Sequence, residues 1–323
     1  TIALTNTIGY NALKTKGYDV VKSFPPIRVF GTIGFIAAMW ITNLTGNKAT
    51  EYQFYISAFA SLALGLYSFT LPKCPPQSQT SGNASFIEMF GLNAFKLFAN
   101  YKMALFFIFS MLLGASLQLT NMYGDVFLDE FKNVPIYADS FVVKYSTIIM
   151  SISQMSETLF ILTIPFFLKS LGIKKVMLLS MFAWVLRFAL FGFGDPAGGL
   201  WMIILSCIVY GMAFDFFNIS GALFVETQCH PSMRASAQGL FMMMTNGFGT
   251  IIGSFISGKL IAAYFTVEKT VVENGQTITH LEKEWPDIWI TFAAYSLVVA
   301  ILFAILFKHK HDRAALENAN LGH

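Results

Sequence analysis

The stretch at residues 146–168, STIIMSISQMSETLFILTIPFFL, is long and apolar enough to cross a membrane, yet Glu157 lies near its middle. Arg187 and Asp215 lie in the same way inside later apolar runs. A charge at the bilayer centre costs about 2.5–3.5 kcal/mol on insertion scales, so three such charges need a compensating reason. The sequence therefore predicts a membrane protein with a polar interior, which is a water-filled pathway, a proton relay or a buried ion pair.

Composition supports this class. The chain of 323 residues is 55% hydrophobic and only 12% charged, with a mean hydropathy of +0.60. Soluble domains carry about 25% charged residues, so we expect a polytopic membrane protein. We expect no nucleic-acid partner. Cys74, Cys207 and Cys229 show neither metal-ligand spacing nor a paired pattern, which predicts no metal site and no disulfide. Nucleophile and dinucleotide motifs are lacking too, so we expect no enzyme and no organic cofactor.

The apolar segments of spanning length predict eight transmembrane helices. Helices are expected because a segment that crosses the lipid on its own must form all of its backbone hydrogen bonds internally. The segments lie near residues 28–46, 53–72, 103–128, 140–168, 174–194, 199–226, 234–264 and 287–307.

The loops between these segments alternate in charge. The basic loops hold Lys14, Lys16, Lys22, Lys73, Lys96, Lys102, Lys169, Lys174, Lys175, Arg234, Lys308, Lys310 and Arg313. The acidic loops hold Glu51, Asp129, Glu130, Asp139, Asp195, Glu268, Glu273, Glu282, Glu284 and Asp287. Because basic loops remain in the cytoplasm, both ends of the chain are predicted to be cytoplasmic.

A long connection between the second and third segments predicts two lobes. Ile2–Leu13 is too short to span a bilayer, and we expect it to be the tail of a helix whose beginning is missing, so that the chain is a fragment. Phe86, Phe90, Ala94, Leu97 and Phe98 recur at helical spacing and predict an amphipathic helix on the membrane surface. The predicted parts are the end of an N-terminal lobe at 1–72, a cytoplasmic linker at 73–102, a six-helix lobe at 103–311 and a tail at 312–323.

Two acidic positions are the main candidates for chemistry. Glu157 shares a helix face with Gln154, three residues earlier, and this pair suits a polar solute or a proton. Asp215 lies among Phe214, Phe216 and Phe217, which suits a ligand with hydroxyls and a flat ring. Glu157 also has a structural alternative, a hydrogen bond or a salt bridge to Arg187, and the alternative for the phenylalanines is that they face lipid.

Other polar residues in the spans are secondary candidates. Gln118 and Asn121 share a face, and their amides match the edge of a nucleobase or a pair of sugar hydroxyls, or else bond between helices. Arg28, Thr32 and Phe35 form a stripe, although Arg28 alone suggests an interfacial residue. We predict that Arg187 is structural and neutralises a neighbouring acid.

Long stretches of the chain resemble one family. KSLGIKK (169–175) is similar to the basic turn of the major facilitator superfamily. The resemblance narrows to its nucleoside:H+ symporter family on FPPIRVFGTIGF (24–35), FFIFSMLLG (106–114), STIIMSISQMSETLFILTIPFFL (146–168), LRFALFGFGDP (186–196), VYGMAFDFFNISG (209–221) and RASAQGLFMMMTNGFG (234–249). The 265–286 loop is longer than the family pattern.

The resemblance implies helices five to twelve of a twelve-helix transporter in the bacterial inner membrane. It implies a monomer that carries nucleosides with protons by alternating access, and a sugar or oligosaccharide proton symporter of the same superfamily is the alternative. Glu157 or Asp215 would carry the proton. The binding pocket implied by the resemblance consists of Arg28, Thr32, Phe35, Gln118, Asn121, Gln154, Glu157, Phe214 and Asp215.

Overall fold

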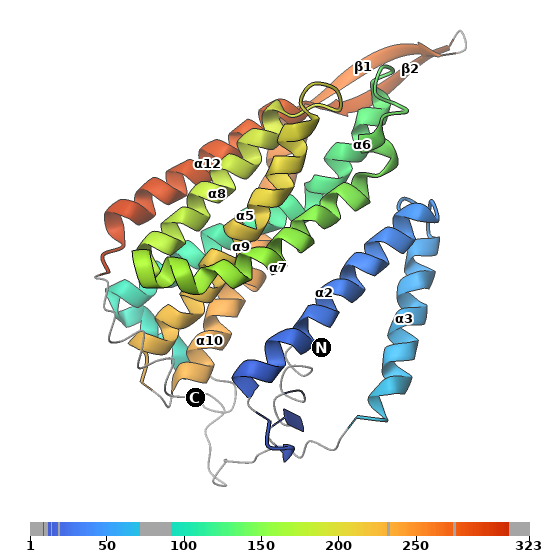
Figure 1. The fold of residues 1–323 in the computed structure, drawn as a ribbon. Coiled ribbons are helices and arrows are strands. Elements are labelled where there is room, and N and C mark those ends of the chain that lie inside the picture. The colour runs from blue at the N-terminus through green and yellow to red at the C-terminus, as the bar shows by residue number, and fades with distance from the viewer. Residues whose placement is uncertain are drawn as a thin grey trace. The chain divides into compact units, whose positions relative to one another are not determined.

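The computed structural model describes residues 9, 12–13, 15–18, 20–71, 92–230, 233–273 and 276–309. These residues belong to two compact units, residues 1–85 and residues 86–322. Helices dominate both units, which confirms the predicted helical membrane fold. The elements in Figure 1 are α2 (Val20–Leu44), α3 (Tyr52–Ser68), η1 (Leu92–Ala99), α5 (Tyr101–Glu130), η2 (Phe131–Asn133), α6 (Phe141–Lys144), α7 (Ser146–Leu171), α8 (Ile173–Phe193), α9 (Leu200–Gln228), α10 (Arg234–Met242), η4 (Met243–Gly249), α11 (Thr250–Tyr264), β1 (Thr266–Glu273), β2 (Gln276–Lys283) and α12 (Trp285–Leu306).

The first unit contains α2 and α3, joined by a turn at Gly46. Gly46 has a φ of +73°, a conformation that glycine adopts without steric cost. Both helices are apolar all round: Phe30 of α2 is 74% exposed and Phe54 of α3 is 70% exposed. Such helices need lipid or protein around them, as expected of membrane spans.

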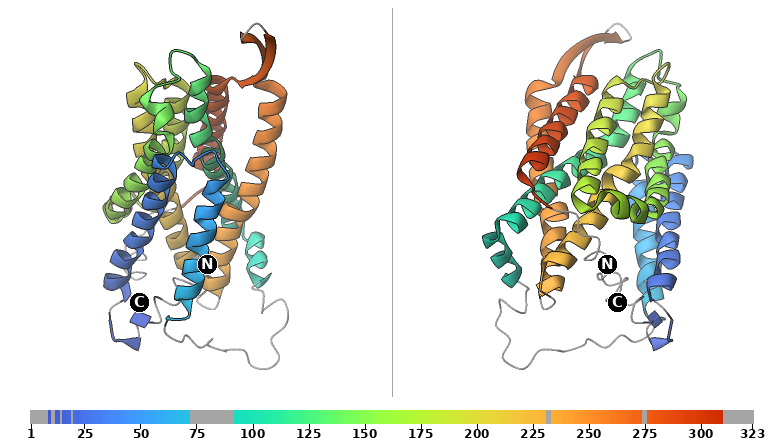
Figure 2. Two further views of the ribbon diagram at one scale, coloured as in Figure 1. Left: turned by 90° about the vertical axis from the view of Figure 1, so that its right-hand side faces the viewer. Right: turned by 60° about the vertical axis from the view of Figure 1, so that its left-hand side comes forward.

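The second unit holds the helices that carry most of the candidate residues. Six of its segments are long and apolar enough to cross a membrane, and they coincide with the last six predicted spans: Tyr101–Asn133, Ser146–Leu171, Ile173–Phe193, Leu200–Gln228, Ser236–Tyr264 and Trp285–Leu306. Helix α9 packs against α7 and α8, α12 packs against α8, and α5 packs against η4 and α11. Figure 2 shows these helices from two further sides.

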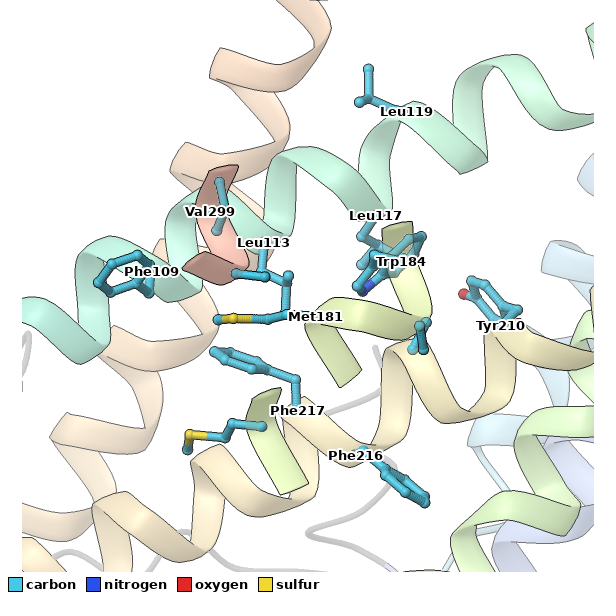
Figure 3. Packing of buried hydrophobic residues seen from close by; sticks show 14 of the residues in the cluster. Phe109, Leu113, Leu117, Leu119, Met181, Trp184, Tyr210, Phe216, Phe217 and Val299 are labelled. Carbon is cyan, nitrogen blue, oxygen red and sulfur yellow. The ribbon is translucent and has the colours of Figure 1, made fainter. Parts of the chain in front are cut away.

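The core of the second unit is rich in large apolar side chains. Figure 3 shows Leu113 and Leu117 of α5 on one side, and Met181, Trp184 and Phe217 of α8 and α9 on the other. All five are buried. Their burial fixes α5, α8 and α9, three of the helices that carry polar candidates.

Glycines bring α5 into backbone contact with the predicted span at 234–264. A Cβ on Gly249 would lie 2.5 Å from the carbonyl oxygen of Met111, and one on Gly253 would lie 2.8 Å from Cα of Ala115. The span is not one regular helix, because η4 is a π-helical segment between α10 and α11. Gly114 faces the backbone of Thr245 in η4, so the irregular turn lies directly against α5.

The structure differs from the prediction of an amphipathic helix at residues 86–98. The first part of the predicted helix, at residues 86–91, lies outside the described residues. The remainder forms η1, a 3-10 helix in which Ala94 is 1% exposed and Phe98 packs on Phe107 of α5, with ring centroids 5.3 Å apart. The apolar side of this segment therefore packs on protein.

The acidic loop at 265–286 contains a β-hairpin that the sequence analysis did not predict. Strands β1 and β2 pair antiparallel, with Thr266 opposite Lys283 and Glu273 opposite Gln276. Figure 1 shows the hairpin at the same end of the unit as α6. Its base is anchored by Glu130 of α5, which pairs with Lys283 and accepts a 2.8 Å hydrogen bond from Trp285 Nε1.

Candidate functional site

The candidates of the first unit all lie on α2. Thr32 is half-buried and Phe35 is 54% exposed, and their spacing of three residues puts them on one face. Arg28 precedes Thr32 by about one helical turn, and its side chain lies outside the described part of the chain.

The candidates of the second unit include two polar pairs, one on α5 and one on α7. On α5, Gln118 is half-buried and Asn121 is exposed, three residues further along the same face. On α7, Gln154 and Glu157 are both half-buried and are spaced in the same way. These four polar side chains are thus accessible from outside the unit rather than sealed in its core.

Helices α7 and α9 come into backbone contact beside Glu157. A Cβ added to Gly211 of α9 would lie 2.6 Å from the carbonyl carbon of Ser156 and 2.7 Å from the backbone nitrogen of Glu157. The hydroxyl of Ser156 donates to the carbonyl oxygen of Ile208 at the same place. The absence of a side chain at position 211 therefore lets Glu157 approach the polar residues of α9.

Tyr210 of α9 lies near candidate groups that are carried on different helices. Its hydroxyl lies close to Gln154, and the charges of Glu157, Asp215 and Arg187 act on it. Its ring stacks on that of Phe214, with centroids 5.8 Å apart and planes inclined by 5°. The result is an aromatic pair near an amide and two carboxylates, in which Tyr210 is buried and Phe214 is half-buried.

The three phenylalanines around Asp215 have different surroundings. Phe216 is buried against Phe167 of α7, and Phe217 is buried in the core shown in Figure 3, so neither faces lipid. Phe214 is half-buried and is the one of the three that a solute can reach from outside the unit. Asp215 itself is 4% exposed.

Arg187 is fully buried, but its contacts differ from the predicted acidic partner. Its guanidinium donates through Nε to Thr120 Oγ1 at 3.3 Å, and through Nη1 to Ser153 Oγ at 3.5 Å and to the Ser206 carbonyl at 2.6 Å. It also lies 4.7 Å from the ring centroid of Tyr210. Among the described residues it forms no salt bridge, so hydroxyls, a carbonyl and aromatic faces compensate its charge.

These contacts make Arg187 a junction of four helices. From α8 it holds Thr120 of α5, Ser153 of α7 and the backbone of α9. Thr120 and Ser153 directly precede Asn121 and Gln154. Arg187 thus fixes the backbone segments that carry two of the candidate amides.

The arrangement suits a neutral solute with a flat ring and hydroxyl groups. The half-buried ring of Phe214, which stacks on the buried Tyr210, offers an apolar face, the amides offer donors and acceptors, and the carboxylates accept hydrogen bonds from hydroxyls. A small pocket beside Phe214 is lined by Leu113, Leu117, Trp184, Ala213, Phe214, Phe217, Asn218 and Thr245. Its lining is mostly apolar.

Tyr210 is not among the residues predicted from the sequence, although a signal for it exists. It precedes Phe214 by four residues, the spacing at which two aromatic side chains meet on one helix face. Its proximity to Gln154 depends on the contact between α7 and α9 and has no signal in either helix alone.

Comparisons with known proteins agree on one family. The family described as "Nucleoside H+ symporter" matches residues 1–312. The chain is 52% identical to the nucleoside permease NupG of Escherichia coli (strain K12) and 50% identical to the xanthosine permease of the same organism; each alignment covers 100% of this chain and 74% of the relative. The crystal structure of NupG superposes with a TM-score of 0.81 at 53% identity, over 96% of this chain and 73% of that chain.

Proposed function

This chain belongs to the nucleoside H+ symporter family, and from that premise we propose that it takes up nucleosides together with protons across the bacterial inner membrane. Transport proceeds by alternating access, both ends of this chain lie in the cytoplasm, and the protein works as a monomer. The family supports nucleosides over sugars as substrates. The observation that carries the proposal is the Tyr210–Phe214 stack beside Gln154, Glu157 and Asp215.

The roles of the residues follow from their chemistry. Gln118, Asn121 and Gln154 hydrogen-bond the base or the sugar, because amides match the donor and acceptor pattern of both. Phe35 and Phe214 pack on ring faces. The remaining members of the site, Arg28, Thr32, Glu157 and Asp215, bind the polar groups of the nucleoside, and the two carboxylates take the ribose hydroxyls.

Proton coupling is assigned to Glu157. A coupling group must exchange protons with water and must also contact the binding site, and Glu157 is half-buried whereas Asp215 is 4% exposed. Protonation from the acidic outer side neutralises Glu157 and lowers the cost of closing the site around the solute. Deprotonation on the cytoplasmic side then favours release.

The first test is uptake by cells that lack other nucleoside transporters and express the protein from its complete gene. Accumulation of radiolabelled uridine is followed with and without a protonophore, and with excess adenosine or lactose as competitor. The proposal predicts accumulation that the protonophore abolishes and that adenosine, but not lactose, blocks. Competition by lactose instead would move the assignment to a sugar symporter.

Glu157→Gln tests the coupling role. The amide keeps the size of the side chain and cannot release a proton, so we expect proton-driven accumulation to disappear while exchange of internal for external uridine continues. Exchange is measured in preloaded cells. If accumulation persists in this variant, Glu157 is not the coupling group, and Asp215→Asn becomes the next variant to test.

A further inference from the structure

A carboxylate that belongs to none of the groups above lies on the same face of α5 as the candidate amides. Asp125 follows Gln118 by seven residues and Asn121 by four, so the three side chains form one stripe on the helix. Asp125 is half-buried, and its Oδ1 accepts a 3.0 Å hydrogen bond from Thr147 Oγ1 of α7.

The contact between Asp125 and Thr147 defines how the two antiparallel helices are aligned. Gln118 precedes Asp125 by seven residues on α5, and Gln154 follows Thr147 by seven residues on α7. Because the two helices are antiparallel, Gln118 and Gln154 lie at the same level. Two other contacts agree with this alignment. A Cβ on Gly124 would lie 2.6 Å from Cε of Met150, and Arg187 joins Thr120 to Ser153.

The aligned stripes form a polar track along the unit. Asp125 and Thr147 lie at the end of this track that is nearer the β-hairpin, and Gln118 and Gln154 lie further in. Seven residues of helix correspond to about 10 Å. A solute that enters from the hairpin end therefore reaches Asp125 before it reaches the amides.

The carboxylate of Asp125 retains capacity to accept hydrogen bonds. The next two acids on α5 are engaged by lysines: Asp129 pairs with Lys132 at 2.6 Å, and Glu130 pairs with Lys283. Within the described part of the chain Asp125 forms no salt bridge, and its one hydrogen-bond donor is Thr147, on Oδ1. Its Oδ2 is thus oriented by that bond and remains available to a ligand.

We propose that Asp125, held by Thr147, is a further substrate-binding residue that accepts hydrogen bonds from the vicinal hydroxyls of the nucleoside sugar at the entrance to the deeper site. The proposal rests on the proposed function. Hydrogen bonds from hydroxyls to an ionised carboxylate are about twice as strong as neutral ones, which suits a subsite that selects ribose before the base is read.

Asp125→Asn separates this role from that of a simple tie between helices. The amide oxygen still accepts the hydrogen bond of Thr147, so the tie remains, while the available oxygen becomes a neutral NH₂ donor. The assay measures the concentrations of unlabelled uridine and of 2′,3′-dideoxyuridine that halve the uptake of trace radiolabelled uridine. Transport is normalised to the amount of protein in the membrane.

We expect the half-inhibiting concentration of uridine to rise about tenfold or more in Asp125→Asn, as for the loss of one charge-assisted hydrogen bond. The value for dideoxyuridine should change by less than about twofold, because that compound lacks the hydroxyls. Asp129→Asn is the matched control: it makes the same change one turn further along α5, and we expect wild-type values for both compounds.

Equal shifts for both compounds, or no shift for either, would overturn the proposal. Thr147→Val gives an independent test if Asp125→Asn does not reach the membrane. It removes the bond that orients Asp125 and keeps the carboxylate, so the half-inhibiting concentration of uridine should rise while that of dideoxyuridine stays unchanged, and equal shifts for both compounds would overturn the proposal. If the unaltered protein takes up no uridine, the proposed function fails, and this result is distinct from the failure of the subsite.

Discussion

Gly211→Ala tests whether the close approach of α7 and α9 holds the site together. The added Cβ would lie 2.6 Å from the carbonyl carbon of Ser156 and 2.7 Å from the nitrogen of Glu157. Nonbonded carbon atoms normally lie about 3.5–4.0 Å apart, so the helices must separate by roughly 1 Å. Both neighbouring atoms belong to the backbone, and rotation of a side chain cannot relieve the contact.

The expected cost follows from that displacement. Overpacking of this kind destabilises a protein by about 1–3 kcal/mol. Displacing Glu157 by ~1 Å also removes hydrogen bonds to a charged group, worth about 1.5–3 kcal/mol, which corresponds to a tenfold or greater loss of affinity for uridine. We therefore expect a lower melting temperature of the purified protein in detergent and a half-saturation concentration raised by about tenfold.

A matched control is available on α11. An added Cβ on Gly258 meets nothing within 4 Å, and alanine is favoured over glycine in a helix by about 0.5–1 kcal/mol. Gly258→Ala should therefore transport uridine normally and melt no lower than the unaltered protein. If Gly211→Ala has the same affinity and melting temperature as Gly258→Ala, the spacing of α7 and α9 does not position Glu157, and the reasoning is refuted.

Two further predictions concern buried groups. Arg187→Lys should lower the melting temperature of the purified protein by the equivalent of roughly 1–3 kcal/mol, because one ammonium cannot replace a guanidinium that bonds three helices; an unchanged melt would contradict the junction role. Burial raises the pKa of the Cys229 thiol above its usual range, with Arg234 opposing the shift and Glu226 adding to it, so alkylation by a maleimide should be slow at pH 7 and should accelerate as the pH rises. Glu226→Gln, which removes a carboxylate 2.7 Å from Arg234, should move that acceleration to lower pH, as followed by mass spectrometry of the Cys229 peptide.

The membrane spans could be predicted because lipid imposes one solution on each segment. An apolar stretch of about 20 residues must be helical to satisfy its own backbone, so its position in the sequence is enough. The hairpin at 266–283 is not under this constraint, because it belongs to a loop beyond the end of a span. Asn274-Gly275 between its strands is a dipeptide typical of tight hairpin turns and was the available signal.

The partners of Arg187 could not be predicted for a different reason. Hydroxyl residues are common in spans, where they usually bond the carbonyl one turn earlier, as Ser110 does with Phe106. Nothing in the sequence separates such residues from Thr120 and Ser153, which turn towards a guanidinium on another helix. A charge in an apolar run predicts that compensation exists, and only packing decides whether an acid or a set of neutral groups provides it.

The site shows how one helix can meet two opposing requirements. A binding face needs polar groups that a solute can reach, whereas a stable interface needs its polar groups buried and satisfied. Adjacent residues meet one requirement each. Thr120 is buried and accepts a hydrogen bond from Arg187, while Asn121 is exposed. Ser153 is buried and accepts a hydrogen bond from the same guanidinium, while Gln154 is half-buried. Successive side chains on a helix point about 100° apart. One of two adjacent polar residues can therefore bind a neighbouring helix while the other faces the solute. The buried arginine is therefore best understood as the support of the binding face, and its loss should disturb both amides together.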